Sequence, residues 1–168
     1  DSQVGNIGSI HKWGTIKTPY GILIISEIEG KIYLFEEGIT PISNLGNRAF
    51  FENNLKGFFS NQFYDLTGVE FPNKNNPANN NGVGYISAFD GKFERFLITK
   101  KDYKVVNKGV KWDSVMKTFY ITDTENIFAR KRVSLNDPIY FCNRSWTIGY
   151  AYEEKEWIGF YSFVPSLY

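Results

Sequence analysis

Three segments of the chain repeat one pattern: an apolar run, a short charged turn and a second apolar run. They cover residues 22–35, 85–98 and 147–160. The turn residues are Glu29, Gly30 and Lys31 in the first segment, Asp90, Gly91 and Lys92 in the second, and Glu153, Glu154 and Lys155 in the third. Glycine after an acidic residue favours a tight turn between antiparallel strands, because glycine readily takes a positive φ angle. The pattern predicts three β-hairpins, the third with a longer or bulged turn because it has no glycine.

Aromatic residues support a β-rich fold. The 168 residues include 15 Phe, 11 Tyr and 4 Trp, and such rings favour pleated, half-buried surfaces. Short apolar runs at 39–42, 110–113, 118–122, 139–142 and 146–152 add further strands. We therefore expect an all-β chain built from repeated antiparallel hairpins.

Two architectures fit these hairpins. The length favours a single domain, with approximate repeats at 8–45, 83–123 and 137–168. If each repeat forms a sheet and the sheets pack radially, the fold is propeller-like. Three repeats make only a partial propeller, because closed propellers have at least about four blades. A β-sandwich is the alternative, and the continuous apolar run Ile22–Ile25 suits strands that are covered on both faces.

Two segments depart from the hairpin pattern. Phe51, Leu55, Phe58 and Phe59 fall at helical spacing, which predicts one short inserted helix over about 47–59; an aromatic loop plug is the alternative. Residues 73–82 include six asparagines, one proline and one glycine. Because these residue types favour turns, we expect a long surface loop there rather than a linker between two small domains.

The sequence contains few residues for catalysis. Its single cysteine excludes an internal disulfide and any multi-cysteine zinc site. We interpret Cys142 as a small buried hydrophobe. We interpret His11 as a structural or surface residue, since no Gly-x-Ser-x-Gly motif supplies a nucleophile. Phosphate-loop and dinucleotide fingerprints are also missing. We therefore predict no catalytic residue, cofactor or metal site, and a protein that is not an enzyme.

Two features suggest binding surfaces. Arg130, Lys131 and Arg132 form the only basic triplet, which suits contact with nucleic acid; a solvated edge strand is the alternative. Trp146, Trp157 and Tyr161 belong to a C-terminal aromatic cluster that suits an interface with another chain or a sugar, or packing in the core. The net charge of +1 excludes a strong overall attraction to polyanions. No run of residues is long and apolar enough to span a membrane.

Several stretches resemble the large, nozzle-like muzzle proteins in the tails of crAss-like bacteriophages. They include Gly8-Ser-Ile-His-Lys-Trp13, Gly30-Lys-Ile-Tyr-Leu-Phe35, residues 41–55, residues 82–103 and Trp157-Ile-Gly-Phe-Tyr-Ser-Phe-Val-Pro-Ser-Leu-Tyr168. The resemblance implies a propeller-like portion of a ring-forming virion tail component on the DNA exit path, in contact with other tail proteins and transiently with phage DNA. It transfers no catalytic residues. The chain is shorter than such proteins and begins with Asp1, so we expect a piece of a longer protein.

A carbohydrate-binding β-domain is the alternative function. It predicts a shallow face with Trp or Tyr rings side by side and polar groups between them. A third hypothesis, a glycoside hydrolase fragment, needs two carboxylates facing each other across a groove. The acidic residues of this chain fall mainly at predicted turns, where solvated charge is expected.

Overall fold

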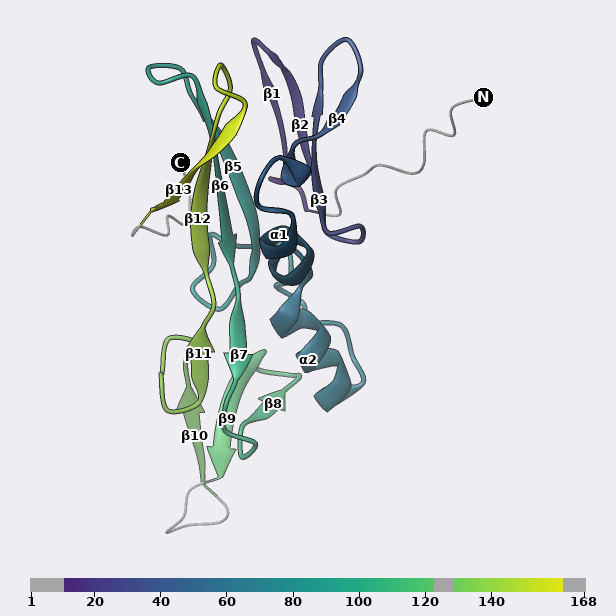
Figure 1. Cartoon of the computed structure of the whole chain (residues 1–168). Coiled ribbons are helices and arrows are strands. Elements are labelled where there is room, and N and C mark those ends of the chain that lie inside the picture. Colours follow the sequence, from purple (N-terminus) through teal and green to yellow (C-terminus); the bar gives the residue numbers. More distant parts are fainter. Residues whose placement is uncertain (1–10, 123–128, 162–168) are drawn as a thin grey trace.

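The computed structural model describes residues 11–122 and 129–161, and shows an elongated molecule of antiparallel sheets with two helices against one side (Figure 1). The prediction of an all-β fold with an inserted helix is confirmed. Residues 8–10, 123 and 162–168 of the expected repeats lie outside the described residues.

The first hairpin belongs to a four-stranded meander in the order β1-β2-β3-β4. Its strands are β1 (Thr15–Thr18), β2 (Gly21–Ser26), β3 (Lys31–Phe35) and β4 (Ile39–Pro41). Strand β2 pairs with β3 from Ile22 opposite Phe35 to Ser26 opposite Lys31. The inward residues Leu23, Ile25 and Ile32 are buried, so hydrophobic burial fixes the register.

The second and third hairpins share one sheet, in the order β13-β12-β6-β5. Its strands are β5 (Gly84–Asp90), β6 (Arg95–Lys101), β12 (Trp146–Ala151) and β13 (Glu156–Tyr161). Strands β6 and β12 join the hairpins, and the side chains of Thr99 and Thr147 hydrogen-bond across that pair at 2.8 Å. The three repeats are therefore not three successive blades, which corrects the propeller-like expectation.

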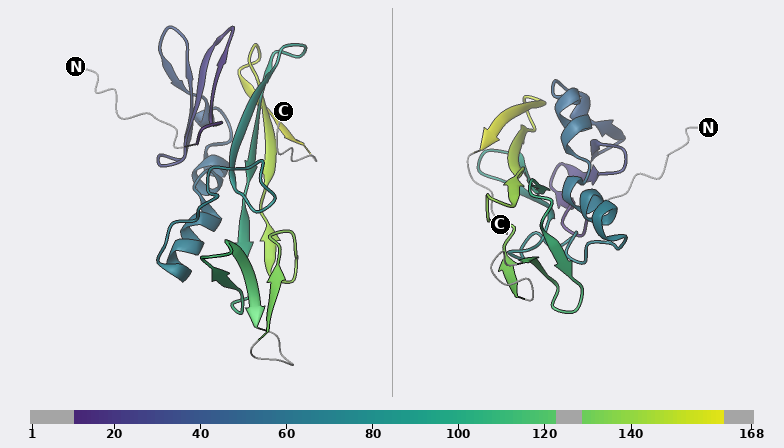
Figure 2. Two further views of the ribbon diagram at one scale, coloured as in Figure 1. Left: turned by 180° about the vertical axis from the view of Figure 1, so that it is seen from behind. Right: turned by 90° about the horizontal axis from the view of Figure 1, so that it is seen from below.

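The two four-stranded sheets instead enclose a common core, as in the sandwich alternative (Figures 1 and 2). Leu23 and Leu34 of the first sheet belong to one buried cluster with Phe96, Ile98 and Ile148 of the second. Apolar side chains on both inner faces drive this association, because each sheet alone would leave one apolar face in water.

Two helices follow the first sheet, where one was expected over 47–59. After the short helix η1 (Ile42–Asn44), α1 (Arg48–Asn54) begins near the predicted start but ends earlier, and α2 (Phe58–Thr67) follows it. The break lies at Gly57, whose backbone is extended (φ −64°, ψ 112°) and packs against Glu27, so that a Cβ there would overlap the carboxylate. The sequence pattern missed this turn because Glu27 approaches from a distant hairpin.

A second core lies below the sandwich in Figure 1. Helix α2 contributes Phe59 and Phe63, which pack with Phe119 and Phe141. The surrounding strands are β7 (Tyr103–Val105), β8 (Lys111–Asp113), β9 (Thr118–Thr122), β10 (Arg130–Val133) and β11 (Phe141–Asn143). Strands β8, β9 and β10 form one small sheet, and β7 pairs with β11.

The two cores share a continuous two-stranded ribbon. Strand β6 leads into β7 after one residue, Asp102, and β11 leads into β12 after two, Arg144 and Ser145. Below the interruption Tyr103 pairs with Asn143, and above it Lys100 pairs with Trp146. The ribbon therefore runs through both halves of the molecule.

The Asn-rich segment 73–82 is a loop without helix or strand. Its base is closed by backbone hydrogen bonds from Val83 N to Asn73 O (3.0 Å) and from Asn76 N to Val83 O (3.1 Å). The Lys101 ammonium donates to the carbonyls of Pro77 (3.1 Å) and Asn79 (2.7 Å). The loop is thus tied to strand β6.

We expect Phe59→Ala to lower the free energy of unfolding by about 3–5 kcal/mol, because it removes a fully buried ring from the lower core. Urea denaturation measures this change. Phe93→Ala is the matched control: that ring is 60% exposed in a hairpin turn, and its loss should change stability by less than about 0.5 kcal/mol. Equal effects of the two substitutions would contradict the assignment of the lower core.

Candidate functional site

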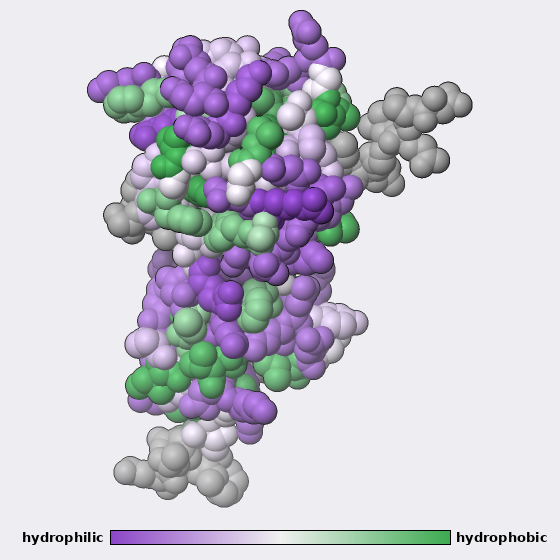
Figure 3. All heavy atoms as spheres, viewed as in Figure 1, coloured by the Kyte–Doolittle hydropathy of each residue, from purple (hydrophilic) through white to green (hydrophobic). Residues whose placement is uncertain are grey.

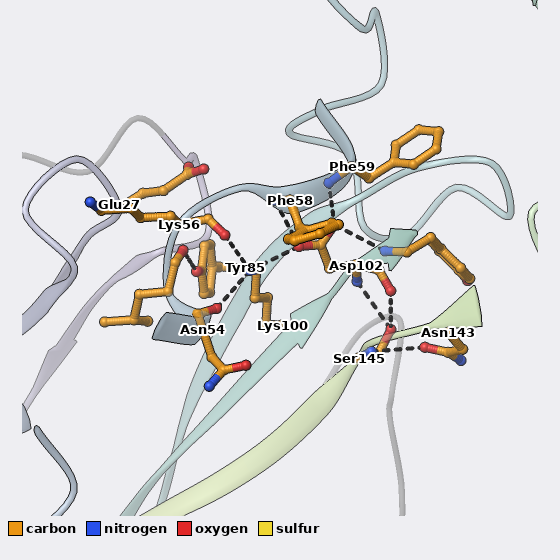
Figure 4. Close-up of polar contacts among 12 residues, drawn as sticks. Glu27, Asn54, Lys56, Phe58, Phe59, Tyr85, Lys100, Asp102, Asn143 and Ser145 are labelled. Carbon is orange, nitrogen blue, oxygen red and sulfur yellow. Dashed lines mark hydrogen bonds and ion pairs between the residues drawn. The ribbon is translucent and has the colours of Figure 1, made fainter. Parts of the chain in front are cut away.

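Charged side chains are buried where the two cores meet, a region that we call the waist. Here α1 ends, α2 begins and Asp102 separates β6 from β7. Lys100 and Asp102 form an ion pair with an Nζ–Oδ2 distance of 2.8 Å, and their side chains are only 6% and 3% exposed (Figure 4). Burying two charges is unfavourable unless their remaining hydrogen bonds are satisfied.

The Lys100 ammonium satisfies all three of its N–H groups. It donates to the backbone carbonyls of Asn54 and Lys56, both at 2.6 Å, and to Asp102. These carbonyls lie at the C-terminal end of α1, where a helix leaves carbonyl groups without intrahelical partners and carries partial negative charge. Lys100 therefore caps the C-terminal end of the first helix.

Asp102 acts at the beginning of the second helix. Its carboxylate accepts hydrogen bonds from the N–H groups of Phe58 and Phe59, each at 3.0 Å, and from that of Tyr103 at 2.9 Å. The N-cap residue Gly57 has no side chain, and the first turn of α2 contains no acidic residue. A carboxylate from the distant ribbon thus does the work of an N-cap side chain.

The backbone of Asp102 also holds the ribbon together at its interruption. Its N–H donates to Ser145 Oγ (3.1 Å), and its carbonyl accepts from Arg144 N (2.9 Å). These bonds replace the regular strand pairing that stops here, so one residue joins both strands of the ribbon to the second helix.

A second polar pair adjoins the first. His11 hydrogen-bonds to Glu27, which lies in the turn between β2 and β3. Burial raises the pKa of Glu27, but the His11 hydrogen bond, the charges of His11 and Lys100 and the Gly57 N–H outweigh burial, so the pKa is lowered. The nearby Tyr85 hydroxyl donates to the Leu55 carbonyl, and its pKa is raised chiefly by burial.

The waist has almost no free space. The cavity between these groups measures about 10 Å³, which is room for about one water molecule. Its lining includes His11, Glu27, Tyr85, Lys100 and Asp102. The arrangement can hold helix ends and turns in place, but it has no room for an organic substrate. Its ionisable groups are bound to backbone atoms and to one another.

The predicted turn residues lie at hairpin turns but at different levels of the molecule. Glu29, Gly30 and Lys31 lie near the waist, with Gly30 at φ +66°. Residues 90–92 and 153–155 lie at the upper end in Figure 1. There Asp90 Oδ1 accepts from Lys92 N (3.0 Å), and Lys155 takes a positive φ of 55° in place of glycine.

The three predicted interface aromatics have partners within the chain. Trp157 donates from Nε1 to the Ile42 carbonyl at 2.9 Å, and Arg95 donates to the Tyr161 hydroxyl at 2.7 Å. The Trp146 ring packs edge-on against Phe50, with centroids 5.2 Å apart. On the same sheet it is Phe160, 60% exposed, that presents its ring to solvent.

The basic triplet is divided between two faces of β10. Arg130 and Arg132 share the outer face of the sheet with Tyr120, whereas Lys131 has the opposite direction because side chains alternate along a strand. Arg130 lies over the Tyr120 ring, 4.6 Å from its centroid, and pairs with Asp113 at 2.9 Å.

A hollow of about 690 Å³ lies at the upper end, next to the stacked rings of Tyr20 and Tyr152. Their centroids are 3.9 Å apart, and the hydroxyls donate to Glu94 and Glu36, respectively. The hydrogen bond to Glu36 raises the pKa of Tyr152 to about 12. Hydrogen bonds from Tyr20 and then Glu153 lower the pKa of Glu94.

Sequence reasoning missed the waist because the adjacent Lys100 and Lys101 give no sign of burial in the sequence. The available signal was a lysine and an aspartate next to a strand that is otherwise apolar, since buried charges need partners. The chain positions of those partners, near residues 54–59, could not be inferred from that signal.

We compared the chain with protein-family models, curated proteins and solved structures, and none of them matches it. Within residues 11–122 and 129–161, no group of three or more His, Cys, Asp or Glu side chains is placed to hold a metal ion.

We expect Lys100→Met to lower the free energy of unfolding by about 3–5 kcal/mol, because it leaves Asp102 buried without its cation. In the Lys100→Met/Asp102→Ala double variant the cost should be smaller than the sum of the two single costs, which a double-mutant cycle in urea measures. Lys104→Met, an exposed position on the same ribbon, is the control. Strict additivity would show that the pair is not coupled.

The lowered pKa of Glu27 predicts acid sensitivity. A carboxyl with a lower pKa in the folded protein than its ordinary value of 4.5 stabilises the fold above that value, and the contribution is lost as the pH falls through the folded pKa. We therefore expect Glu27→Gln to destabilise the protein at neutral pH and to reduce the loss of stability between about pH 6 and about pH 3. Parallel pH profiles of urea midpoints for the two proteins would contradict this assignment.

Proposed function

We propose that the chain is a non-catalytic structural component of a bacteriophage virion, part of the short-tail muzzle assembly on the DNA exit path. The observation that carries this proposal is the use of the buried charges at the waist. Lys100 and Asp102 are bound to the ends of two helices and to the ribbon. That arrangement suits a stiff spacer. The assignment to the phage tail rests on the sequence resemblance to muzzle proteins.

A structural component needs contacts with neighbours more than a deep pocket. On the face drawn in Figure 3, hydrophobic residues form separate patches among hydrophilic ones. Phe160 and Phe93 are each 60% exposed on the sandwich half. We assign the contacts with other tail proteins, and with copies of the chain in a ring, to such patches. In the described part of the chain, no helix has the length and hydrophobicity needed to cross a bilayer.

Carbohydrate binding is a second candidate function. The specific observation in its favour is the upper hollow, where Tyr20, Tyr152 and Glu36 combine rings with hydrogen-bonding groups. However, the stacking of the two tyrosines covers one face of each ring, which reduces the surface on which a sugar could lie. We therefore rank this function below the structural one.

The structural proposal predicts that the protein is part of the particle. Gold-labelled antibodies against this chain should mark the tail end of virions purified from the native source. The mass of the protein released intact from those particles should correspond to several copies or to a longer chain. Labelling of the head, or recovery only as a free monomer together with specific binding on a glycan array, would favour the second candidate.

A further inference from the structure

The Asn-rich loop and strand β10 meet at a polar hollow of about 390 Å³. Its lining consists of Asn80, Asn81, Thr118, Arg132, Val133 and Ser134. The hollow brings together two segments that stood out in the sequence for separate reasons, the asparagine run and the basic triplet. It shares no lining residue with the tyrosine hollow at the upper end.

The lining supplies hydrogen-bond donors and a positive charge. Arg132 is exposed and offers a planar guanidinium, the two asparagines offer amide N–H₂ groups, and Thr118 and Ser134 offer hydroxyls. None of the lining residues is acidic. Donors gathered around an arginine suit an anion with several oxygens, above all a phosphate, which arginine binds with two parallel hydrogen bonds.

The loop side of the hollow is held in place before any ligand arrives. Lys101 ties down the carbonyls of Pro77 and Asn79, directly before the two asparagines. Gly82 N donates to Asn79 O at 2.9 Å directly after them. Because the backbone is tethered on both sides of Asn80 and Asn81, less conformational entropy is lost when an anion binds.

The hollow continues into a row of side chains across the small sheet. Arg132 of β10 pairs with Tyr120 of β9, and Tyr120 pairs with Lys111 of β8. Paired residues point to the same face, so the two cations flank a half-buried ring on the outer surface. Since neighbouring strands are about 4.8 Å apart, the Cα atoms of the two residues lie roughly 10 Å from each other across the sheet.

We propose that this surface binds a single strand of nucleic acid. One phosphate occupies the hollow and contacts Arg132, the strand crosses Tyr120, and a second phosphate meets Lys111. Sequence-tolerant proteins hold single strands with cations that follow the backbone beside aromatic rings. Here Arg130 already covers one face of the Tyr120 ring, 4.6 Å from its centroid, so the two phosphate contacts carry the proposal. Of the basic triplet, Arg132 provides the main contact, Arg130 is held by Asp113, and Lys131 faces the other way.

The proposal does not depend on the virion assignment, because it concerns the isolated chain in solution. Fluorescence anisotropy with a labelled single-stranded oligonucleotide of mixed sequence, titrated over a range of salt concentrations, provides the measurement. We expect Arg132→Ala to weaken binding roughly tenfold at low salt, as expected for loss of one charge-assisted contact, and to reduce the salt slope by about one. Asn80→Asp should also weaken binding, because it places a carboxylate in the hollow without changing its shape.

Lys17→Ala is the matched control. It removes the same charge from an exposed site on β1 and should leave the affinity unchanged. Equal urea midpoints for all variants would show that folding is intact. No binding by the unmodified chain, or an equal loss in Lys17→Ala, would overturn the proposal. So would self-association that Arg132→Ala abolishes while the oligonucleotide fails to bind, because the occupant would then be a second copy. None of these results would alter the antibody labelling of virions.

Discussion

The ion pair between Lys100 and Asp102 is the interaction on which the rest of the structure depends. The upper sandwich and the lower core are separate hydrophobic clusters. Apolar burial within each cluster does not by itself determine how the two cores are positioned relative to one another. Lys100 caps the end of one helix and Asp102 caps the start of the next. Lys100 lies near the end of β6, and Asp102 directly follows that strand. The charges are stable there because backbone groups and the ion pair itself replace the hydrogen bonds that they lose to water.

The sequence predicted local structure better than long-range arrangement. The hairpins followed from apolar runs and turn residues such as Asp90, because that information lies within a few residues. The arrangement of the hairpins did not follow, since the β6–β12 pairing joins segments far apart in the chain. Helix α2 and its capping by Asp102 were missed for the same reason. For the proposed nucleic-acid surface, the sequence indicated Arg132, whereas only strand register could add Lys111.

The two hollows differ in chemistry, although the net charge is only +1. The upper hollow is lined by tyrosines and carboxylates such as Glu36, and the lower hollow by donors around Arg132. A phosphate would be repelled at the first and attracted at the second. A near-neutral composition therefore does not make the surface uniform. It allows an anionic ligand to be confined to one of the two hollows.

The ribbon that crosses the waist also determines how the molecule bears mechanical force. Its antiparallel hydrogen bonds lie perpendicular to the strands, and the strands run along the length of the molecule (Figure 1). Tension that pulls β12 along β6 loads these bonds in shear, all at once rather than one after another. The interruption at Asp102 is bridged by Ser145 and Arg144, so the load passes from one half to the other without a hinge.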